Sequence, residues 1–322
     1  MAIEYLACGN VMTDMIALPD GTISEKNMGG DAVYALSGMR LWSPNCALVS
    51  HVGADYEETY GTWMDENGMP RTYAQVAAEH CSAFVLQYAQ DGSFTPVPVY
   101  SYANKGYLKV RPEDIEAACS REAVKAIYTV QYTDRVIWGK IAELKKKHGF
   151  QIMWEIEFDR AFRTREGIDC TKSWPDVERT LQIADMFSIN HNEAADLFGI
   201  PRDDDAAMIR RLQQLPVAFT LYRVGSRGTY VVSSDEVLFC GSVDPYGASV
   251  DPTGCGNTST GAAMQAYASG DSLTMVAAKA CVAAGFNAAQ RGPIPRYTPE
   301  KLALAQSLAA SCCENDVRVC LL

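Results

Sequence analysis

Short apolar runs alternate with longer amphipathic segments along most of the chain. The apolar runs have the length of buried strands, and the segments between them place apolar residues at helical spacing. The predicted strands are Tyr5–Cys8, Ala47–Val52, Ala126–Val130, Gln151–Ile156, Met186–Ile189, Ala218–Val224 and Thr229–Val232. The predicted helices are Ala32–Leu41, Asp134–His148, Asn192–Phe198, Asp204–Leu215, Thr258–Tyr267, Leu273–Gln290 and Pro299–Ala310. This alternation predicts an α/β fold, with a doubly wound, mostly parallel sheet and helices on both faces.

Two regions depart from the alternation. Val11–Lys26 and Ser82–Tyr102 show period-2 character with little helical pattern, and they contain the turn pairs Asp20-Gly21 and Asp91-Gly92. The second pair separates two apolar runs, which is typical of a β-hairpin. We therefore expect one α/β domain over residues 1–322, into which a small β lid formed by about 11–28 and 82–103 is inserted. An ordinary edge hairpin is the alternative interpretation.

Composition narrows the range of partners. The 322 residues carry a net charge of −11, which argues against nucleic acid or an anionic membrane as the main partner. No segment approaches the ~20 apolar residues of a membrane span, and no signal-peptide pattern precedes the first strand. The eleven cysteines form no Cys-x-x-Cys pair and are expected to be buried thiols in a reducing compartment. A cytoplasmic protein is expected.

The segment from Asp251 to Gly261 holds the strongest candidate chemistry. Gly254 and Gly256 allow a tight turn directly before a segment of small residues that is predicted to be helical. Backbone N–H groups and the positive end of the helix dipole would then face the same point, which favours a bound phosphate or another anion. The segment lacks the third glycine of a Rossmann fingerprint and the lysine of a Walker A loop. A different kind of anion site is indicated.

Together with four further matches in order, this segment resembles the PfkB (ribokinase-like) family of carbohydrate and nucleoside kinases. The C-terminal signature of that family is matched by Asp251-Pro252-Thr253-Gly254-Cys255-Gly256. The other matches are Gly29-Gly30, Ala47–Gly53 with Asp55, Asn190-His191-Asn192-Glu193, and Arg223-Val224-Gly225-Ser226-Arg227-Gly228. The resemblance covers nearly the whole chain and implies a ribokinase-like fold.

The resemblance also implies roles for individual residues. Asp14, Gly29, Gly30, Asp31 and Tyr34 would bind a sugar or nucleoside acceptor. Asn190, Arg223, Gly225, Gly228 and Thr253 would line the site for ATP, and Glu193 would help to hold Mg²⁺ through water. The N–H groups of Gly254, Cys255 and Gly256 would stabilise the charge of the transition state. Family members often pair through the small β element, so a homodimer through the β lid is expected. For several of these residues the sequence alone also allows a purely structural role: a turn for Gly30, Gly225 and Gly228, and a dipole contact for Glu193.

The chain departs from the family at the catalytic position. The family has an aspartate base where this chain has Asn257, and an amide cannot take the hydroxyl proton at neutral pH. General-base catalysis contributes about 10²–10⁴-fold, but phosphoryl transfer depends mostly on positioning and charge neutralisation. We therefore expect a slowed kinase in which Asn257 orients the acceptor hydroxyl. Tyr34 and Ser259 also differ from the usual family residues, which indicates natural divergence of the acceptor site.

Three functions remain open from the sequence. The first is a PfkB-type kinase that transfers the γ-phosphoryl group of ATP to a hydroxymethyl group. The second is non-kinase chemistry on a sugar phosphate or nucleoside, with Asp251, Asp31 or Cys255 as the reactive group. The third is a non-catalytic sensor of a sugar or nucleotide. All three share the anion site, and the variant Asn257→Asp would separate them by its effect on turnover.

Overall fold

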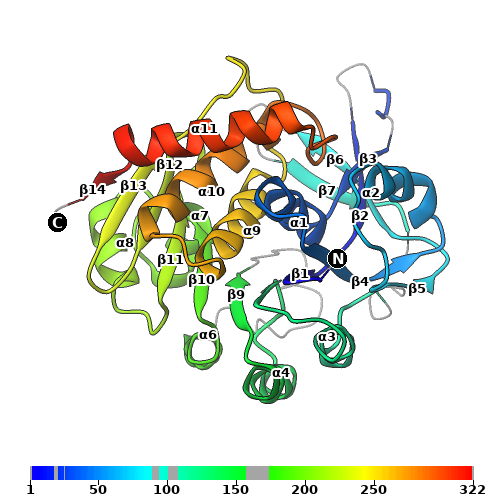
Figure 1. Cartoon of the computed structure of the whole chain (residues 1–322), viewed down its shortest axis with the longest axis horizontal. Helices are drawn as coiled ribbons and strands as arrows, with labels where there is room; N and C mark the ends of the chain where they lie inside the picture. The colour runs from blue at the N-terminus through cyan, green and yellow to red at the C-terminus, as the bar shows by residue number, and fades with distance from the viewer. Residues whose placement is uncertain are drawn as a thin grey trace.

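The main sheet of the protein has ten strands and is parallel over most of its width (Figure 1). The structure is a computed structural model that describes residues 2–17, 21–24, 26–88, 94–100, 108–156 and 174–320. In sheet order the strands are β14 (Arg318–Val319), β13 (Val237–Gly241), β12 (Gly228–Val232), β11 (Phe219–Arg223), β10 (Met186–Asn190), β9 (Gln151–Glu155), β8 (Ala126–Thr129), β1 (Tyr5–Cys8), β4 (Cys46–Gly53) and β5 (Ala74–Ala78). Every pair from β5 to β11 is parallel, and the pairs from β11 to β14 are antiparallel.

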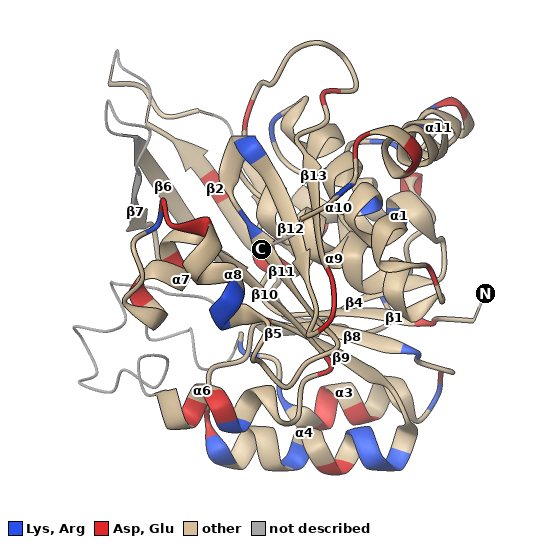
Figure 2. Cartoon of the chain, turned by 90° about the vertical axis from the view of Figure 1, so that its left-hand side faces the viewer, with Lys and Arg blue, Asp and Glu red and all other residues tan. Residues whose placement is uncertain are grey.

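Helices cover both faces of this sheet, as the pattern predicts (Figures 1 and 2). One core lies under α1 (Asp31–Trp42), α9 (Cys255–Ala268), α10 (Leu273–Ala288) and α11 (Pro299–Asn315). The other lies under α3 (Pro112–Cys119), α4 (Arg135–His148), α6 (Trp174–Leu181), α7 (His191–Phe198) and α8 (Asp205–Leu212). Because both faces are covered, β1 and β8 are buried at every position, which explains their continuous apolar runs.

Helices α1 and α9 pack closely in the first core. A Cβ at Gly38 would overlap the carbonyl of Thr258, and a Cβ at Gly261 would overlap the carbonyl of Ala35. The two backbones therefore approach each other at positions where only glycine fits. This packing fixes the start of α9 over the carboxyl end of the sheet.

A second, four-stranded sheet stands beside the main one. Its order is β3 (Asn27–Gly29), β2 (Met12–Ile16), β6 (Ser82–Tyr88) and β7 (Phe94–Pro98). The expectation of a separate small β element is confirmed, and β6 and β7 pair antiparallel. The turn pair Asp91-Gly92 lies outside the described residues, as does Asp20. That this sheet acts as a lid stays a prediction.

The hydrophobic pattern does not predict several short elements of the structure. These are the π-helix η1 (Glu57–Gly61), α2 (Thr62–Glu66), α3, α6, β5 and β13. Each is eight residues or shorter, so each offers too few positions for a period to show. The cysteines that the structure describes are free thiols, most of them buried. Within the described residues, no helix is both long enough and apolar enough to span a bilayer.

Candidate active site

The carboxyl ends of β9, β10 and β11 lie next to one another and place polar side chains at one edge of the sheet. Glu155 is the partner of Ser188 across β9 and β10. Asn190 is the partner of Arg223 across β10 and β11. Ligands of open α/β sheets bind beyond this edge. The predicted residues Asn190 and Arg223 are therefore brought together here.

Helix α7 begins at this edge with a capping box. The side chain of Asn190 accepts hydrogen bonds from the N–H groups of Asn192 and Glu193 at 2.9 and 3.0 Å. The carboxylate of Glu193 accepts in return from the N–H of Asn190 at 2.9 Å. This reciprocal arrangement fixes both side chains at the start of the helix. The dipole contact and a ligand-facing role for Glu193 are compatible, because a carboxylate has more than one acceptor site.

Helix α9 begins with the glycine turn that the sequence indicates. Gly254 is the N-cap residue in a left-handed conformation, with φ 78°. The carboxylate of Asp251 accepts from the N–H of Thr253 at 2.9 Å, and this bond shapes the turn. Because Gly254 has no side chain, the first turn receives no side-chain cap from it. The N–H of Cys255 donates to the carbonyl of Pro252 at 3.1 Å, which leaves the N–H groups of Gly256 and Asn257 for an anion.

Arg223 crosses from the end of β11 to the start of α9. Its Nη2 lies 2.7 Å from Oε1 of Glu155 and 3.7 Å from Oε2 of Glu193. A Cβ at Gly256 would overlap its Nη1, so the absence of a side chain at 256 is what admits the guanidinium. The buried Nε has no hydrogen-bond partner among the described residues. Two carboxylates thus hold a cation at a helix N-terminus, where the dipole alone would disfavour it.

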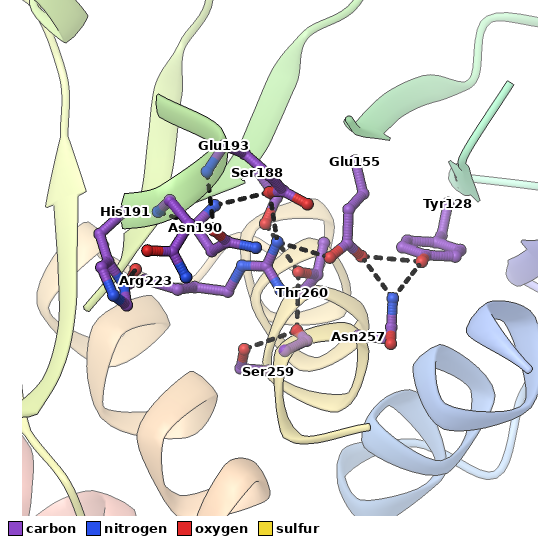
Figure 3. A network of polar contacts seen from close by, with 12 residues as sticks. Tyr128, Glu155, Ser188, Asn190, His191, Glu193, Arg223, Asn257, Ser259 and Thr260 are labelled. Atoms are coloured by element: carbon purple, nitrogen blue, oxygen red, sulfur yellow. Dashed lines mark hydrogen bonds and ion pairs between the residues drawn. The ribbon is translucent and has the colours of Figure 1, made fainter. Parts of the chain in front are cut away.

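Asn257, in the first turn of α9, contacts two groups at the ends of β8 and β9. Its Nδ2 donates to Oε2 of Glu155 and to the hydroxyl of Tyr128, each at 3.2 Å (Figure 3). The Tyr128 hydroxyl donates to the same Glu155 oxygen at 2.7 Å. Burial, followed by the charge of Glu155, raises the pKa of Tyr128 well above its usual value, so the phenol stays protonated. Asn257 is partly exposed, whereas Glu155 is 3% exposed and lies behind it.

Hydroxyl groups tie the start of α9 to β10. Ser188 and Thr260 share a hydrogen bond of 2.7 Å between their hydroxyl oxygens. Thr260 also lies 2.9 Å from the carbonyl of Gly256, and Ser259 donates to that carbonyl at 2.7 Å. Ser259, which stands where the family usually has an aromatic residue, therefore stabilises the first turn of the helix.

The predicted acceptor residues gather on the small sheet and at the start of α1. A Cβ at Gly29 would overlap the carboxylate of Asp14, so this side chain lies directly against the glycine. Burial, followed by the charge of Asp251, raises the pKa of Asp14 to about 6. The second cause places Asp14 near the loop that precedes α9. Gly30 has φ 104°, and a Cβ there would overlap the carbonyl of Asn10.

Asp31 and Tyr34 are held by the protein itself. Asp31 accepts from the backbone and side-chain amides of Asn10 at 2.7 and 2.8 Å, and burial raises its pKa to about 7. The ring of Tyr34 fills the space beside Gly254, where a Cβ would collide with it. Tyr34 is buried, with its hydroxyl 3.4 Å from the carbonyl of Met28. Both residues support the turn, and direct ligand contact by either one stays a prediction.

The two remaining predicted glycines differ in their surroundings. A Cβ at Gly225 would lie 3.6 Å from the ring of His191, beside the capping box of α7. A Cβ at Gly228 would overlap the carbonyl of Cys240 across the hairpin of β12 and β13. Gly228 is therefore required by strand packing, whereas Gly225 lines the same edge as Asn190 and Arg223.

Glu155 and Tyr128 are the site residues that the sequence interpretation missed. Both lie within predicted strands, Tyr128 in Ala126–Val130 and Glu155 near the end of Gln151–Ile156, where it is the charged residue of an apolar run. An ionisable residue at the carboxyl end of a buried strand was the available signal, since such residues are rarely buried without a partner.

The chain was compared with known proteins. Residues 6–300 match the family model described as the pfkB family of carbohydrate kinases. An uncharacterised protein of Schizosaccharomyces pombe is 23% identical over 329 residues, covering 92% of this chain and 87% of that protein. A Burkholderia thailandensis nucleoside kinase in complex with inosine superposes with a TM-score of 0.71 at 16% identity, covering 95% of this chain and 96% of the other. An Escherichia coli protein classed as a ribokinase II, in complex with ATP and Mg²⁺, gives 0.73 at 17% identity and covers 96% and 99%.

The structural neighbours share the fold of this chain, and the family match extends from its first strand to its last long helix. The ribokinase-like fold predicted from the sequence is therefore confirmed. The chain belongs to the pfkB family of carbohydrate kinases.

Proposed function

We propose that the protein transfers the γ-phosphoryl group of ATP to a hydroxymethyl group of a sugar or nucleoside. The observation that carries this proposal is the position of Arg223, a cation held by Glu155 and Glu193 at the uncapped start of α9. A guanidinium at the helix start that carries the N–H groups of Gly256 and Asn257 suits a phosphoryl group whose charge spreads over three oxygens. The Nε of Arg223 is buried without a partner among the described residues, so the guanidinium has an unused donor that a small shift on phosphate binding would expose.

The roles of the chain's residues follow from their positions. The N–H groups of Gly254 and Gly256, together with Arg223, would stabilise the transferred group, and that of Cys255 would join them once it leaves the carbonyl of Pro252. Asp14 would hold an acceptor hydroxyl, and Asn257 would accept a hydrogen bond from the attacking one. The acceptor oxygen forms the new bond to phosphorus while the bond to the ADP oxygen breaks, and the hydroxyl proton passes to an oxygen of the transferred phosphoryl group. Positioning and charge neutralisation supply most of the rate in such a transfer.

Magnesium fits this site through few protein ligands. Among the residues that the structure describes, no group of three or more His, Cys, Asp or Glu side chains is arranged to hold a metal ion. Mg²⁺ in nucleotide sites keeps several waters and uses one or two carboxylates plus phosphates. Glu193 would be the carboxylate here, and the ion would neutralise phosphate charge.

Pairing of two chains through the small sheet also stays a prediction.

Non-kinase chemistry with the thiol of Cys255 as the reactive group is disfavoured. Burial raises the pKa of Cys255 to about 11, and its Sγ lies 3.4 Å from the carbonyl of Ala284. The thiol is therefore protonated at neutral pH, and the thiolate is the reactive form. The carboxylates of Asp251 and Asp31 are likewise engaged by local N–H groups.

The test is ADP release with Mg²⁺ and ATP over a panel of sugars and nucleosides. We expect at least one acceptor to raise the rate above the acceptor-free background. The variant Arg223→Gln, purified in the same way, should lose this stimulation and so exclude a contaminating kinase. Stimulation by no acceptor, or equal stimulation in the variant, would overturn the proposal.

A further inference from the structure

The carboxylate of Glu155 is the centre of the polar network in Figure 3. Its Oε2 accepts from the hydroxyl of Tyr128 at 2.7 Å and from Nδ2 of Asn257 at 3.2 Å. Its Oε1 lies 2.7 Å from Nη2 of Arg223. The residue is 3% exposed, so these donors replace the water that an ionised carboxylate needs. The guanidinium and this carboxylate form an ion pair.

This carboxylate determines which way the amide of Asn257 points. An ionised carboxylate accepts hydrogen bonds and donates none, so it can face Nδ2 but not Oδ1. The Tyr128 hydroxyl donates its hydrogen bond to Glu155. The phenol oxygen therefore faces Nδ2 of Asn257 as an acceptor. Both neighbours impose the same orientation. The amide oxygen is left on the opposite side, away from Glu155 and Tyr128 (Figure 3).

The same geometry makes an aspartate unfavourable at position 257. It would place a second carboxylate about where Nδ2 of Asn257 now lies, 3.2 Å from Oε2 of Glu155. Two carboxylates at such a distance cannot both ionise, and one takes up a proton. Positions 155 and 257 therefore favour one carboxylate and one amide over two ionised carboxylates.

We propose that Glu155 is a positioning residue that holds the amide of Asn257 with Oδ1 toward the acceptor hydroxyl, and that it carries the single negative charge of the pair. In this pair the carboxylate stands on β9 and the amide on α9. This inference rests on the proposed kinase function. It explains why an asparagine is compatible with turnover, since its oxygen accepts the hydroxyl's hydrogen bond in a fixed direction.

Three variants test the pair against the wild type. In Glu155→Gln, the new amide can face Arg223 with its oxygen and Asn257 with its nitrogen. Asn257 would then turn its oxygen inward and its nitrogen toward the acceptor, which is the wrong group. In the double variant Glu155→Gln with Asn257→Asp, the amide and the carboxylate exchange places and every contact is satisfied again. In Asn257→Asp alone, the carboxylate of Glu155 and the new carboxylate at position 257 lie next to each other.

The kinetic readout is kcat and the KM of the acceptor at pH 7. We expect Glu155→Gln to lose about tenfold or more in kcat, the effect of one hydrogen bond offered by the wrong group, with little change in the acceptor KM. The double variant should regain at least about tenfold over Glu155→Gln, since coupled residues are non-additive. The control Glu143→Gln, at an exposed position on α4, should match the wild type.

Wild-type kcat in Glu155→Gln, or no recovery in the double variant, would overturn the inference while the kinase function stands. A wild type that no acceptor stimulates would overturn the function itself.

A second readout needs no turnover. The folded-state pKa of the new carboxyl in Asn257→Asp should lie above its unfolded value, so the stability of this variant should fall relative to wild type as the pH rises from about 4. The double variant should not show this fall, because position 155 is then neutral. Melting temperatures between pH 5 and pH 8 measure the difference. Parallel curves for the wild type and Asn257→Asp would show that Glu155 does not restrict position 257, which would overturn the inference.

Discussion

The guanidinium of Arg223 lies against Gly256, in the space that a Cβ at position 256 would occupy. We expect Gly256→Ala to displace Arg223 from Glu155 and to lower kcat by about tenfold or more, since each 1.4 kcal/mol lost from transition-state stabilisation costs a factor of ten. Folding stability should fall as well, because the displaced guanidinium leaves the buried carboxylate of Glu155 without its cation. Steady-state kinetics and melting temperatures measure the two effects.

A matched control for this substitution is Gly139→Ala on α4. This glycine is also helical, and a Cβ there meets nothing within 4 Å. It should leave the kinetics unchanged and raise the free energy of unfolding by up to about 1 kcal/mol. Equal kcat in the two variants would contradict the packing of Arg223 against the first turn of α9.

Arg223 should not be replaceable by lysine. Its planar fork reaches Glu155 and approaches Glu193 from one nitrogen while another nitrogen lies over Gly256. An ammonium group is a single point charge and cannot make these contacts together. We expect Arg223→Lys to raise the KM for ATP about tenfold, with a smaller change in the KM of the acceptor. A selective effect on the acceptor would show that Arg223 belongs to the other half of the site.

The buried carboxyl of Asp31 should make stability depend on pH. Burial raises its pKa from 3.8 to about 7, so the folded state binds more protons than the unfolded state between about pH 4 and pH 7. Stability is then present at low pH and is lost as the pH rises through this window. Asp31→Asn should remove this loss, which amounts to about 4 kcal/mol at most because each pKa unit corresponds to about 1.4 kcal/mol. Denaturant unfolding at pH 5 and pH 7.5 would show whether the difference between variant and wild type grows with pH.

The thiol of Cys255 should be dispensable. Its pKa of about 11 leaves little thiolate at neutral pH. Cys255→Ser keeps a small group that donates toward the carbonyl of Ala284, so kcat should stay within about threefold of the wild type. Iodoacetamide should likewise label this position slowly at pH 7.5, as peptide mapping by mass spectrometry can show. Complete loss of activity in Cys255→Ser would instead favour covalent chemistry at this residue.

Periodicity was sufficient for the main fold because both faces of the sheet are covered. Buried strands such as β1 and β8 are then apolar throughout, and α4 lies between the cap Asp134 and the left-handed Gly149. Of the residues named from motifs, Arg223 and Tyr34 lie against Gly256 and Gly254 at the start of α9. The network around Glu155 could not be predicted, because it joins positions 128, 155, 223 and 257, which only the parallel register of β8 to β11 brings together.

Tyr34 illustrates a second limit of sequence interpretation. Its position in the glycine motif indicates an acceptor-binding residue, but its ring is buried against Gly254. Motif spacing places a residue on a helix, whereas the direction of its side chain depends on what the neighbouring element leaves open. Here a glycine on α9 leaves space for a ring. The same dependence hides the contact of Arg223 with Gly256.

The approach of α1 and α9 should be the most sensitive point of the scaffold. A Cβ at Gly261 would overlap the carbonyl of Ala35, which is backbone and cannot move aside without shifting α1. We expect Gly261→Ala to destabilise the protein by about 1–3 kcal/mol, the usual cost of overpacking a filled core, despite the better helix propensity of alanine. Because the shift would also move the turn at Gly254, kcat should fall with stability. Denaturant unfolding with Gly139→Ala as the reference measures the first effect. A variant as stable as that reference would show that the two helices are packed less closely than the structure has them.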